Sequence, residues 1–310
     1  MKNIEVDNMK LTELQEKLNQ GDDKKTVALA QAADPEVLKA VKTAIEMKLS
    51  RFKLFGDIEL IRKYADELSL DIHQSDIEII HTVSNREAAK HAVQNVHDNK
   101  ADVLMKGNLP TKEVLKQVLN KEYGLRTNRV LSHVSVFDIP NQDRLIYLTD
   151  AAMNVTPELD VKAQIIQNAV DVYQNVQSNT PKVAALAAVE VVNPQMKATV
   201  DAAALSQMQN RGQITGCMVD GPLAFDNAVS RESAEEKGIT SEVAGQADIL
   251  LVPELETGNA LYKSFIYFAG AKVASVISGA AAPIVLTSRS DTHESKLYSM
   301  ILALLTAFNK

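Results

Sequence analysis

The stretch TVALAQAADPEVLKAVKTAI, residues 26–45, decides the fold class of this 310-residue chain. Its first part, Thr26–Gln31, is a short apolar run of the kind typical of a buried strand. Asp34-Pro35 then predicts the start of a helix, because proline suits the first helical position. The apolar residues that follow recur at helical spacing: Val37, Leu38, Val41, Ala44 and Ile45. The stretch therefore predicts one strand followed by one amphipathic helix.

The same alternation continues on both sides of a central change of pattern. Strands are predicted at 52–55, 77–81, 102–105, 182–190, 214–220, 248–253, 272–277 and 283–288, and helices at 58–68, 85–97, 158–174, 194–209 and 257–270. This βαβα series predicts a mostly parallel sheet flanked by helices. Between residues 130 and 149, two strand-like runs flank Pro140–Asp143, which predicts a long hairpin and a seam between two halves.

The last helix is predicted to run from Asp291 or Thr292 to Phe308. It is apolar nearly all round, which predicts deep burial. Asp291 and Glu294 have the spacing of a capping box, so we expect Asp291 to cap this helix.

Composition excludes several classes of protein. A formal charge of −7 leaves no basic face for nucleic acid, and the absence of Trp with 5% aromatics disfavours base stacking. Every apolar run is interrupted before membrane-spanning length, and the first ten residues lack an apolar signal core. The single Cys217 excludes an internal disulfide and is predicted to be a core thiol within a strand. We therefore expect a cytoplasmic enzyme that contacts neither nucleic acid nor membrane.

Five junctions carry residues suited to chemistry, and ligands of open α/β sheets bind at such junctions. At the first, Lys106 offers a charge, Gly107 permits close backbone approach, and Thr111 is predicted to cap the next helix. At the second, Asp220 precedes Gly221-Pro222 in a predicted rigid turn, with Asp226 as a possible helix cap. For both of these junctions, the alternative interpretation is a turn with solvated charged side chains.

The other junctions follow the same logic. At the third, Lys263 is predicted near the first turns of a helix that follows Pro253. At the fourth, Arg289 lies at a helix start among the hydroxyl residues Thr287, Ser288 and Ser290. This combination suits a tetrahedral oxyanion. At the fifth, Arg129 and His133 lie at the seam between the two halves. The alternative interpretations are that Arg129 is a surface charge and that His133 is a structural residue.

Several familiar sites are missing from the sequence. No Gly-x-Gly-x-x-Gly follows the first strand, and neither a GxxxxGK[ST] loop nor a Gly-x-Ser-x-Gly elbow occurs. No His or Cys cluster has the spacing of metal ligands. Phosphate handling without a nucleotide loop or a metal is the function that remains.

The chain resembles the phosphate acetyl/butyryl-transferase family over nearly its whole length. The motifs are DGPLAFDNA (220–228), AGQADILLVPELETGNALYKSFIYFAGA (244–271) and the strand ending in Ser288-Arg289, with Lys106-Gly107 and the Arg129 segment. The resemblance implies two α/β domains with a cleft between them, similar to isocitrate and isopropylmalate dehydrogenases. The domains are expected at 1–137 plus 281–310 and at 138–280.

The resemblance also implies a homodimer and a reaction between acyl-CoA and inorganic phosphate that gives acyl phosphate and coenzyme A. No metal, cofactor or covalent acyl-enzyme is expected, and coenzyme A is a substrate. Arg289 is expected to balance phosphate and oxyanion charge, and Ser288 to bond the reacting group. The expected substrate-binding residues are Lys106, Gly107, Thr111, Arg129, His133, Asp220, Lys263 and Ser290.

Two departures point to the butyryl or branched-chain branch of that family. Acetyl-specific members carry Asn-Asp-Leu before Ser-Arg-Gly, whereas residues 285–290 here read VLTSRS. Acetyl-specific members also carry an Asp seven residues after the serine. Here that position is Ser295, and Glu294, directly before it, is the candidate base. Four alternatives stay open. Two are an acetyltransferase and a metal- and NAD-dependent decarboxylating dehydrogenase of the same fold, which would use Asp220 and Asp226. The others are a non-catalytic acyl-CoA-binding protein and a transferase acting on acyl carrier protein.

Overall fold

The computed structural model describes residues 10–19, 24–140, 142–287 and 291–307. The chain divides into two compact units. The N-terminal unit consists of Thr12–Arg129 and Ala274–Lys310, and the central unit of Val130–Val273 with Met1–Leu11. The sequence placed the seams after residues 137 and 280, whereas the units divide after Arg129 and Val273. Within the described residues, no helix is long and apolar enough to cross a membrane.

The N-terminal unit is built on strands in the order β3-β2-β1-β4-β11-β10. The strands are β1 (Thr26–Ala30), β2 (Arg51–Gly56), β3 (Ile77–His81), β4 (Val103–Lys106), β10 (Lys272–Ser278) and β11 (Ile284–Val285), and the helices are η1 (Leu11–Glu13), α1 (Leu14–Asn19), α2 (Pro35–Glu46), α3 (Ile58–Glu67), α4 (Asn85–His97), α5 (Thr111–Val118) and α11 (His293–Thr306). All neighbouring strands from β3 to β11 pair in parallel, and β10 pairs antiparallel with β11. The predicted parallel sheet is confirmed here.

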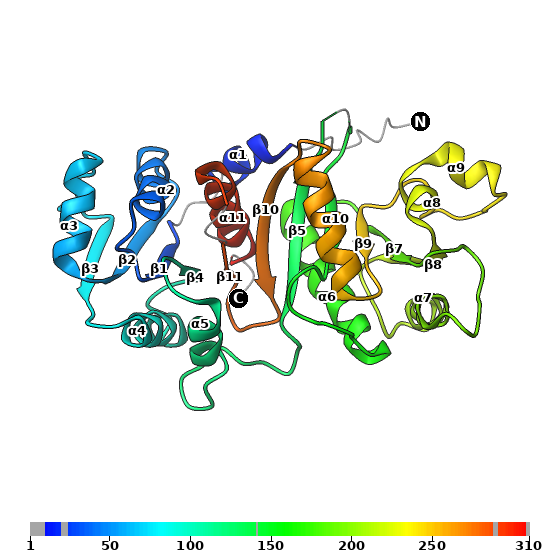
Figure 1. Ribbon diagram of the computed structural model, residues 1–310, viewed down its shortest axis with the longest axis horizontal. Coiled ribbons are helices and arrows are strands. Elements are labelled where there is room, and N and C mark those ends of the chain that lie inside the picture. The colour runs from blue at the N-terminus through cyan, green and yellow to red at the C-terminus, as the bar shows by residue number, and fades with distance from the viewer. Residues whose placement is uncertain (1–9, 20–23, 141, 288–290, 308–310) are drawn as a thin grey trace. The chain divides into compact units, whose positions relative to one another are not determined.

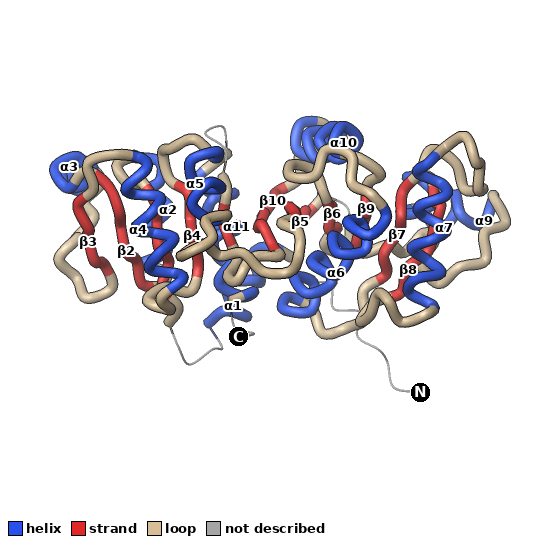
Figure 2. The backbone as a smooth tube through the Cα atoms, turned by 90° about the horizontal axis from the view of Figure 1, so that it is seen from below, coloured by secondary structure: helices blue, strands red, loops and turns tan. Residues whose placement is uncertain are grey.

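The strand order reverses between β1 and β4. The chain moves outward from β1 to β2 and β3, then returns through α4 to place β4 on the other side of β1. Helices α2, α3 and α11 cover one face of this sheet, and α4 and α5 cover the other (Figures 1 and 2). Open α/β sheets bind ligands at the carboxyl ends of the strands where the order reverses.

Local sequence explains how α2 begins. Asp34 has extended backbone, and its carboxylate accepts a hydrogen bond from Val37 N at 3.0 Å, with Pro35 at the first helical position. The apolar face of α2 is buried, including Val37, Leu38 and Val41. This start, predicted from sequence, is confirmed.

The closing helix α11 is buried along most of its length, as predicted, but its cap differs. Thr292 is the N-cap, and its hydroxyl accepts a hydrogen bond from Ser295 N at 3.1 Å. The expectation that Asp291 caps the helix is therefore wrong. The helix starts one residue later than a cap at Asp291 requires, and a threonine hydroxyl serves as well as a carboxylate at this position.

The central unit has strands in the order β5-β6-β9-β7-β8. Its strands are β5 (Ser132–Asp138), β6 (Ile146–Thr149), β7 (Lys182–Leu186), β8 (Met218–Leu223) and β9 (Ile249–Leu251), and its helices are α6 (Leu159–Val176), α7 (Lys197–Asn210), α8 (Phe225–Val229), α9 (Arg231–Glu236) and α10 (Leu255–Tyr267). The predicted hairpin is the antiparallel pair β5–β6, and the remaining pairs are parallel. Helices α6 and α7 cover one face, and α8 and α10 cover the other (Figure 1).

The edge strand β8 differs from the sequence-based expectation. Asp220, Gly221 and Pro222 lie inside the strand rather than in a turn, and Cys217 precedes it. The register passes from Ala184 opposite Asp220 to Leu186 opposite Leu223, so β8 carries an extra residue. Proline is tolerated at such a bulge on an edge strand because no ladder hydrogen bond is lost. The predicted turn is wrong for this reason.

Candidate active site

A pocket of about 290 Å³ lies in the N-terminal unit where the strand order reverses. Its lining follows β1 (Asp34, Glu36 and Val37), β4 (Lys106, Gly107 and Asn108) and β11 (Thr287), with Lys296 contributed by α11. The pocket lies at the carboxyl ends of parallel strands, where ligand sites of open α/β sheets form. We call this the switch-point pocket.

Lys106 is the last residue of β4 and is only 6% exposed. Its Nζ donates hydrogen bonds to the backbone oxygens of Gly107 and Leu109, at 3.2 and 3.3 Å. Those oxygens orient the ammonium group. The predicted binding residue is therefore held in place at the pocket.

Gly107 permits a close contact between two strand ends. Its N–H donates to Ala30 O at 2.8 Å, and a Cβ placed on it would lie 2.1 Å from Gln31 O. Any side chain here would separate β4 from β1. The sequence predicted close backbone approach to a ligand, whereas the close neighbour in the structure is the end of β1.

The acids of the switch-point pocket already have partners. The Asp34 carboxylate caps α2, and exposed Glu36 forms an ion pair with Lys39 at 2.5 Å. The pKa of Glu36 is lowered, first by the hydrogen bond from Lys39 and also by the charge of Lys296. Lys106 and Lys296 are both buried. The first turn of α2 adds the positive end of its helix dipole to their charges. This arrangement favours an anion.

Three further predicted residues of this unit do not line the switch-point pocket. Thr111 is exposed and is the first residue of α5, whose N-cap is Pro110, so the expected threonine cap is wrong. Arg129 is exposed in the loop before β5. Glu294 is exposed in the first turn of α11 and accepts a hydrogen bond from the Tyr298 hydroxyl at 3.2 Å.

In the central unit, His133 lies at the same edge of the sheet as the carboxyl ends of the parallel strands. It is buried at the start of β5, its Nδ1 lies 3.2 Å from Ser135 Oγ, and its ring centre lies 6.0 Å from that of Tyr262. Buried Asp150 follows β6 and accepts bonds from Ala152 N and Met153 N, both at 2.9 Å. These bonds hold the turn that follows β6.

Three other residues singled out in the sequence lie on β8, α8 and α10 of the central unit. Asp220 is half-buried in β8, and its carboxylate accepts a bond from Gly221 N at 2.8 Å. Asp226 lies in the first turn of α8, whose N-cap is Ala224, so the expected aspartate cap is wrong. Lys263 was predicted near the first turns of its helix; it is exposed in the third turn of α10, which begins at Leu255, slightly earlier than predicted.

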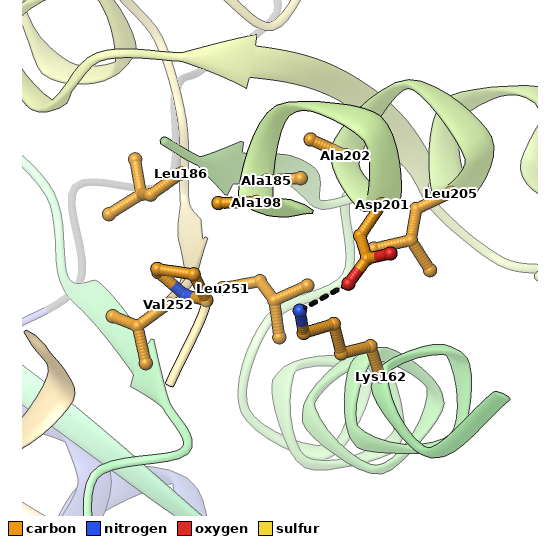
Figure 3. Close-up of a pocket in the computed structure, with 10 residues that line it drawn as sticks. Lys162, Ala185, Leu186, Ala198, Asp201, Ala202, Leu205, Leu251 and Val252 are labelled. Atoms are coloured by element: carbon orange, nitrogen blue, oxygen red, sulfur yellow. Dashed lines mark hydrogen bonds and ion pairs between the residues drawn. The ribbon is translucent and has the colours of Figure 1, made fainter. Parts of the chain in front are cut away.

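A second, much smaller pocket of about 10 Å³ lies beyond the carboxyl ends of β7 and β9 (Figure 3). Most of its walls are small or apolar, and Lys162 of α6 donates to Asp201 of α7 at 2.7 Å across it. Lys197 also donates to Asp201 at 2.7 Å. The volume suits about one water molecule, so this pocket is a packing feature rather than a substrate site.

Ser288, Arg289 and Ser290, the centre of the predicted oxyanion receptor, lie outside the described residues. They directly follow Thr287 in the sequence. Among the described residues, no three His, Cys, Asp or Glu side chains are grouped as metal ligands would be. Lys296 was missed by sequence reasoning, because a lysine in an apolar helix carries no signal of burial.

Comparison with known proteins places the chain in a family. The family model for phosphate acetyl/butaryl transferase matches residues 75–304. A probable phosphate butyryltransferase of Bacillus subtilis strain 168 is 58% identical over 280 residues, covering 90% of this chain and 92% of the relative. A phosphate acetyltransferase of Thermotoga maritima is 43% identical over 283 residues, covering 91% and 95%.

A solved structure has the same architecture. The branched-chain phosphotransacylase of Enterococcus faecalis V583 superposes with a TM-score of 0.80 at 34% identity, covering 92% of this chain and 99% of that one. The fold, the family model and the relatives agree, and the chain belongs to the phosphate acetyl/butaryl transferase family.

Proposed function

We propose that this chain transfers a butyryl or branched short-chain acyl group from coenzyme A to inorganic phosphate, giving acyl phosphate and free coenzyme A. The observation that carries the proposal is the 58% identity, over 90% of the chain, to a probable phosphate butyryltransferase. The switch-point pocket supports it, because two buried lysines and a helix N-terminus suit a phosphate-type anion.

The chemistry needs a nucleophile, charge stabilisation and a leaving group. A phosphate oxygen attacks the thioester carbonyl carbon, the new C–O bond forms, and the C–S bond breaks with its electron pair on sulfur. The thiolate of coenzyme A then takes a proton, which an ordinary thiol holds with a pKa of about 8.5. No covalent bond to the enzyme is needed.

The sequence assigns residues to these steps, and we keep the assignments as part of the proposal. Arg289 balances charge on phosphate and on the tetrahedral oxyanion, and Ser288 donates to the reacting group. One preorganised donor of this kind typically supplies about 3–4 kcal/mol of transition-state stabilisation. The exposed Glu294 is a poor candidate for a base because its carboxylate bonds to Tyr298 and does not line the switch-point pocket.

A second candidate is the same reaction with acetyl-CoA, because a relative at 43% identity is named phosphate acetyltransferase. The sequence VLTSRS at 285–290, without the Asn-Asp-Leu of acetyl-specific members, favours the longer acyl groups. The homodimer, the cytoplasmic location and the lack of a cofactor remain predictions.

The experiment that tests the proposal follows thiol release from butyryl-CoA with and without phosphate, with EDTA as a metal control. Acyl phosphate is trapped in parallel with hydroxylamine. We expect thiol release to require phosphate and to match acyl phosphate formed, unchanged by EDTA. Thiol release at the same rate without phosphate would identify a thioesterase instead.

A further inference from the structure

Lys296 is a buried lysine that the assignments above leave without a role. It is 5% exposed and lies in the first turn of α11, where its backbone N–H donates to Thr292 O at 3.0 Å. Its side chain turns back toward the start of the helix, and Nζ donates to Asp291 O at 2.5 Å. Burying an ammonium group is costly unless something compensates its charge.

No carboxylate in the described part of the chain lies within ion-pair distance of Lys296 Nζ. Buried Lys162 shows the contrast, because it forms an ion pair with Asp201 at 2.7 Å. A lysine ammonium has three donors, and one backbone oxygen uses only one of them. Two donors of Lys296 therefore remain for a ligand.

The position of Lys296 specifies where that ligand lies. Lys296 lines the switch-point pocket together with Lys106, which approaches from β4 on the sheet side. The charge of Lys296 is felt in the pocket, since it contributes to the lowered pKa of Glu36 after the larger effect of Lys39. Asp34 and Glu36 are already engaged by Val37 N and by Lys39.

We propose that Lys296 binds a phosphate group directly in the switch-point pocket, acting with Lys106 as a two-lysine clamp. Compact ammonium groups serve as point charges for phosphate, in contrast to the bidentate fork of arginine. The inference rests on the proposed function only in identifying the anion as phosphate. Inorganic phosphate and the phosphates of coenzyme A share this chemistry, and the kinetics below separate them.

The test compares three variants of the full chain. Lys296→Met removes the charge and keeps the length of the side chain, and Lys296→Arg restores a charge. Lys63→Met is the matched control, because it removes an exposed lysine of α3 that pairs with Glu67 and does not line the pocket. Circular dichroism verifies folding, and Lys296→Gln, which keeps a donor for Asp291 O, replaces Lys296→Met if that variant does not fold.

We expect Lys296→Met to raise KM for one phosphate-bearing substrate by about tenfold to a hundredfold, as loss of one charge-assisted bond does. A rise in KM for inorganic phosphate alone assigns the pocket to the acyl acceptor, and a rise for butyryl-CoA alone assigns it to coenzyme A. Lys296→Arg should recover part of the loss, and Lys63→Met should change either KM less than about twofold.

A readout independent of turnover is the increase in Tm that inorganic phosphate or coenzyme A gives to the wild-type protein. We expect Lys296→Met to lose this increase for the ligand whose KM rises, and Lys63→Met to keep it. Unchanged KM values and unchanged ligand-induced Tm in the folded Lys296 variants would overturn the role of Lys296. Phosphate-independent thiol release by the wild-type protein would instead overturn the proposed function.

Discussion

Lys106, the last residue of β4, and Lys296, in the first turn of α11, line one pocket although nearly two hundred residues separate them in the chain. Both ammonium groups donate to backbone carbonyl oxygens. This placement follows from the parallel pairing of β4 with β11, which brings the start of α11 to the carboxyl end of β4.

Arg289→Ala is expected to reduce kcat by about a hundredfold to a thousandfold, because a preorganised charged donor at the transition state is lost. Arg289→Lys should recover little, since a lysine cannot reproduce the bidentate fork. Steady-state kinetics with butyryl-CoA measure this, and exposed Arg62→Ala, which breaks only a surface pair with Glu59, serves as the control. Near-wild-type turnover of Arg289→Ala would refute the assignment.

Glu294→Gln is expected to lower kcat much less than Arg289→Ala and to leave the acid limb of the pH–rate profile in place. The reason is that Glu294 is exposed, bonds to the Tyr298 hydroxyl and does not line the switch-point pocket. Tyr298→Phe removes that bond and controls for its structural effect. If Glu294→Gln is as damaging as Arg289→Ala and abolishes the acid limb, Glu294 is the general base.

Gly107→Ala is expected to destabilise the protein by about 1–3 kcal/mol, as overpacking typically does, and to lower activity as well. The added methyl would clash with Gln31 O and Ala30 O, so β4 and Lys106 must move. Gly270→Ala is the control: its Cβ has open space but a φ of 65°, so it costs about 1–2 kcal/mol of backbone strain. Urea unfolding and kcat distinguish the two, because Gly270→Ala should keep normal turnover.

Cys217→Ala is expected to keep kcat within about twofold. Burial raises the pKa of the Cys217 thiol to about 11, so at neutral pH little of the nucleophilic thiolate is present. A thiol reagent should label the folded protein slowly and the urea-unfolded protein rapidly. A tenfold loss of kcat in the variant, or an acyl group found on Cys217, would contradict a reaction without a covalent intermediate.

Lys162→Met is expected to destabilise the protein. Breaking a buried ion pair costs about 3–5 kcal/mol, and the loss here should be smaller because Lys197 still pairs with Asp201. Burial opposes ionisation of Asp201, but the bonds from Lys162 and Lys197 outweigh it and lower its pKa. A lowered carboxyl pKa gives stability that is present above the unfolded value and is lost as pH falls through the folded value.

The wild-type urea midpoint should therefore fall as pH drops below about 4, and Lys162→Met should show a smaller part of that fall. Lys197→Met, whose side chain is 57% exposed, should cost at most about 1 kcal/mol. Equal stabilities of Lys162→Met and the wild-type protein would show that this ion pair contributes nothing to folding.

Local signals predicted most of the N-terminal unit. Asp34-Pro35 begins α2 as expected because capping depends on residues three apart, and alternation of strands and helices indicated the parallel sheet. Features that depend on tertiary pairing were not predictable. Gly221-Pro222 lies in a bulged edge strand instead of a turn, because β8 pairs with β7 on both sides of it, at Asp220 and at Leu223.

The candidate site was predicted in part for the same reason. Lys106 and Gly107 follow a buried strand, which is a local signal, and both line the switch-point pocket. Lys296 has no local signal, because its burial depends on packing of α11 against β4 and α2. Thr111 failed as a cap because Pro110 already has the extended backbone of the N-cap.

The most direct test of the account is the ratio of kcat/KM for butyryl-CoA and isobutyryl-CoA to that for acetyl-CoA, at saturating phosphate. Each methylene in an apolar pocket is worth about 1–3 kcal/mol of discrimination, which corresponds to roughly tenfold or more. We predict that the four-carbon substrates exceed acetyl-CoA by at least that factor, with phosphate required throughout. Acetyl-CoA as the best substrate would contradict the butyryl assignment.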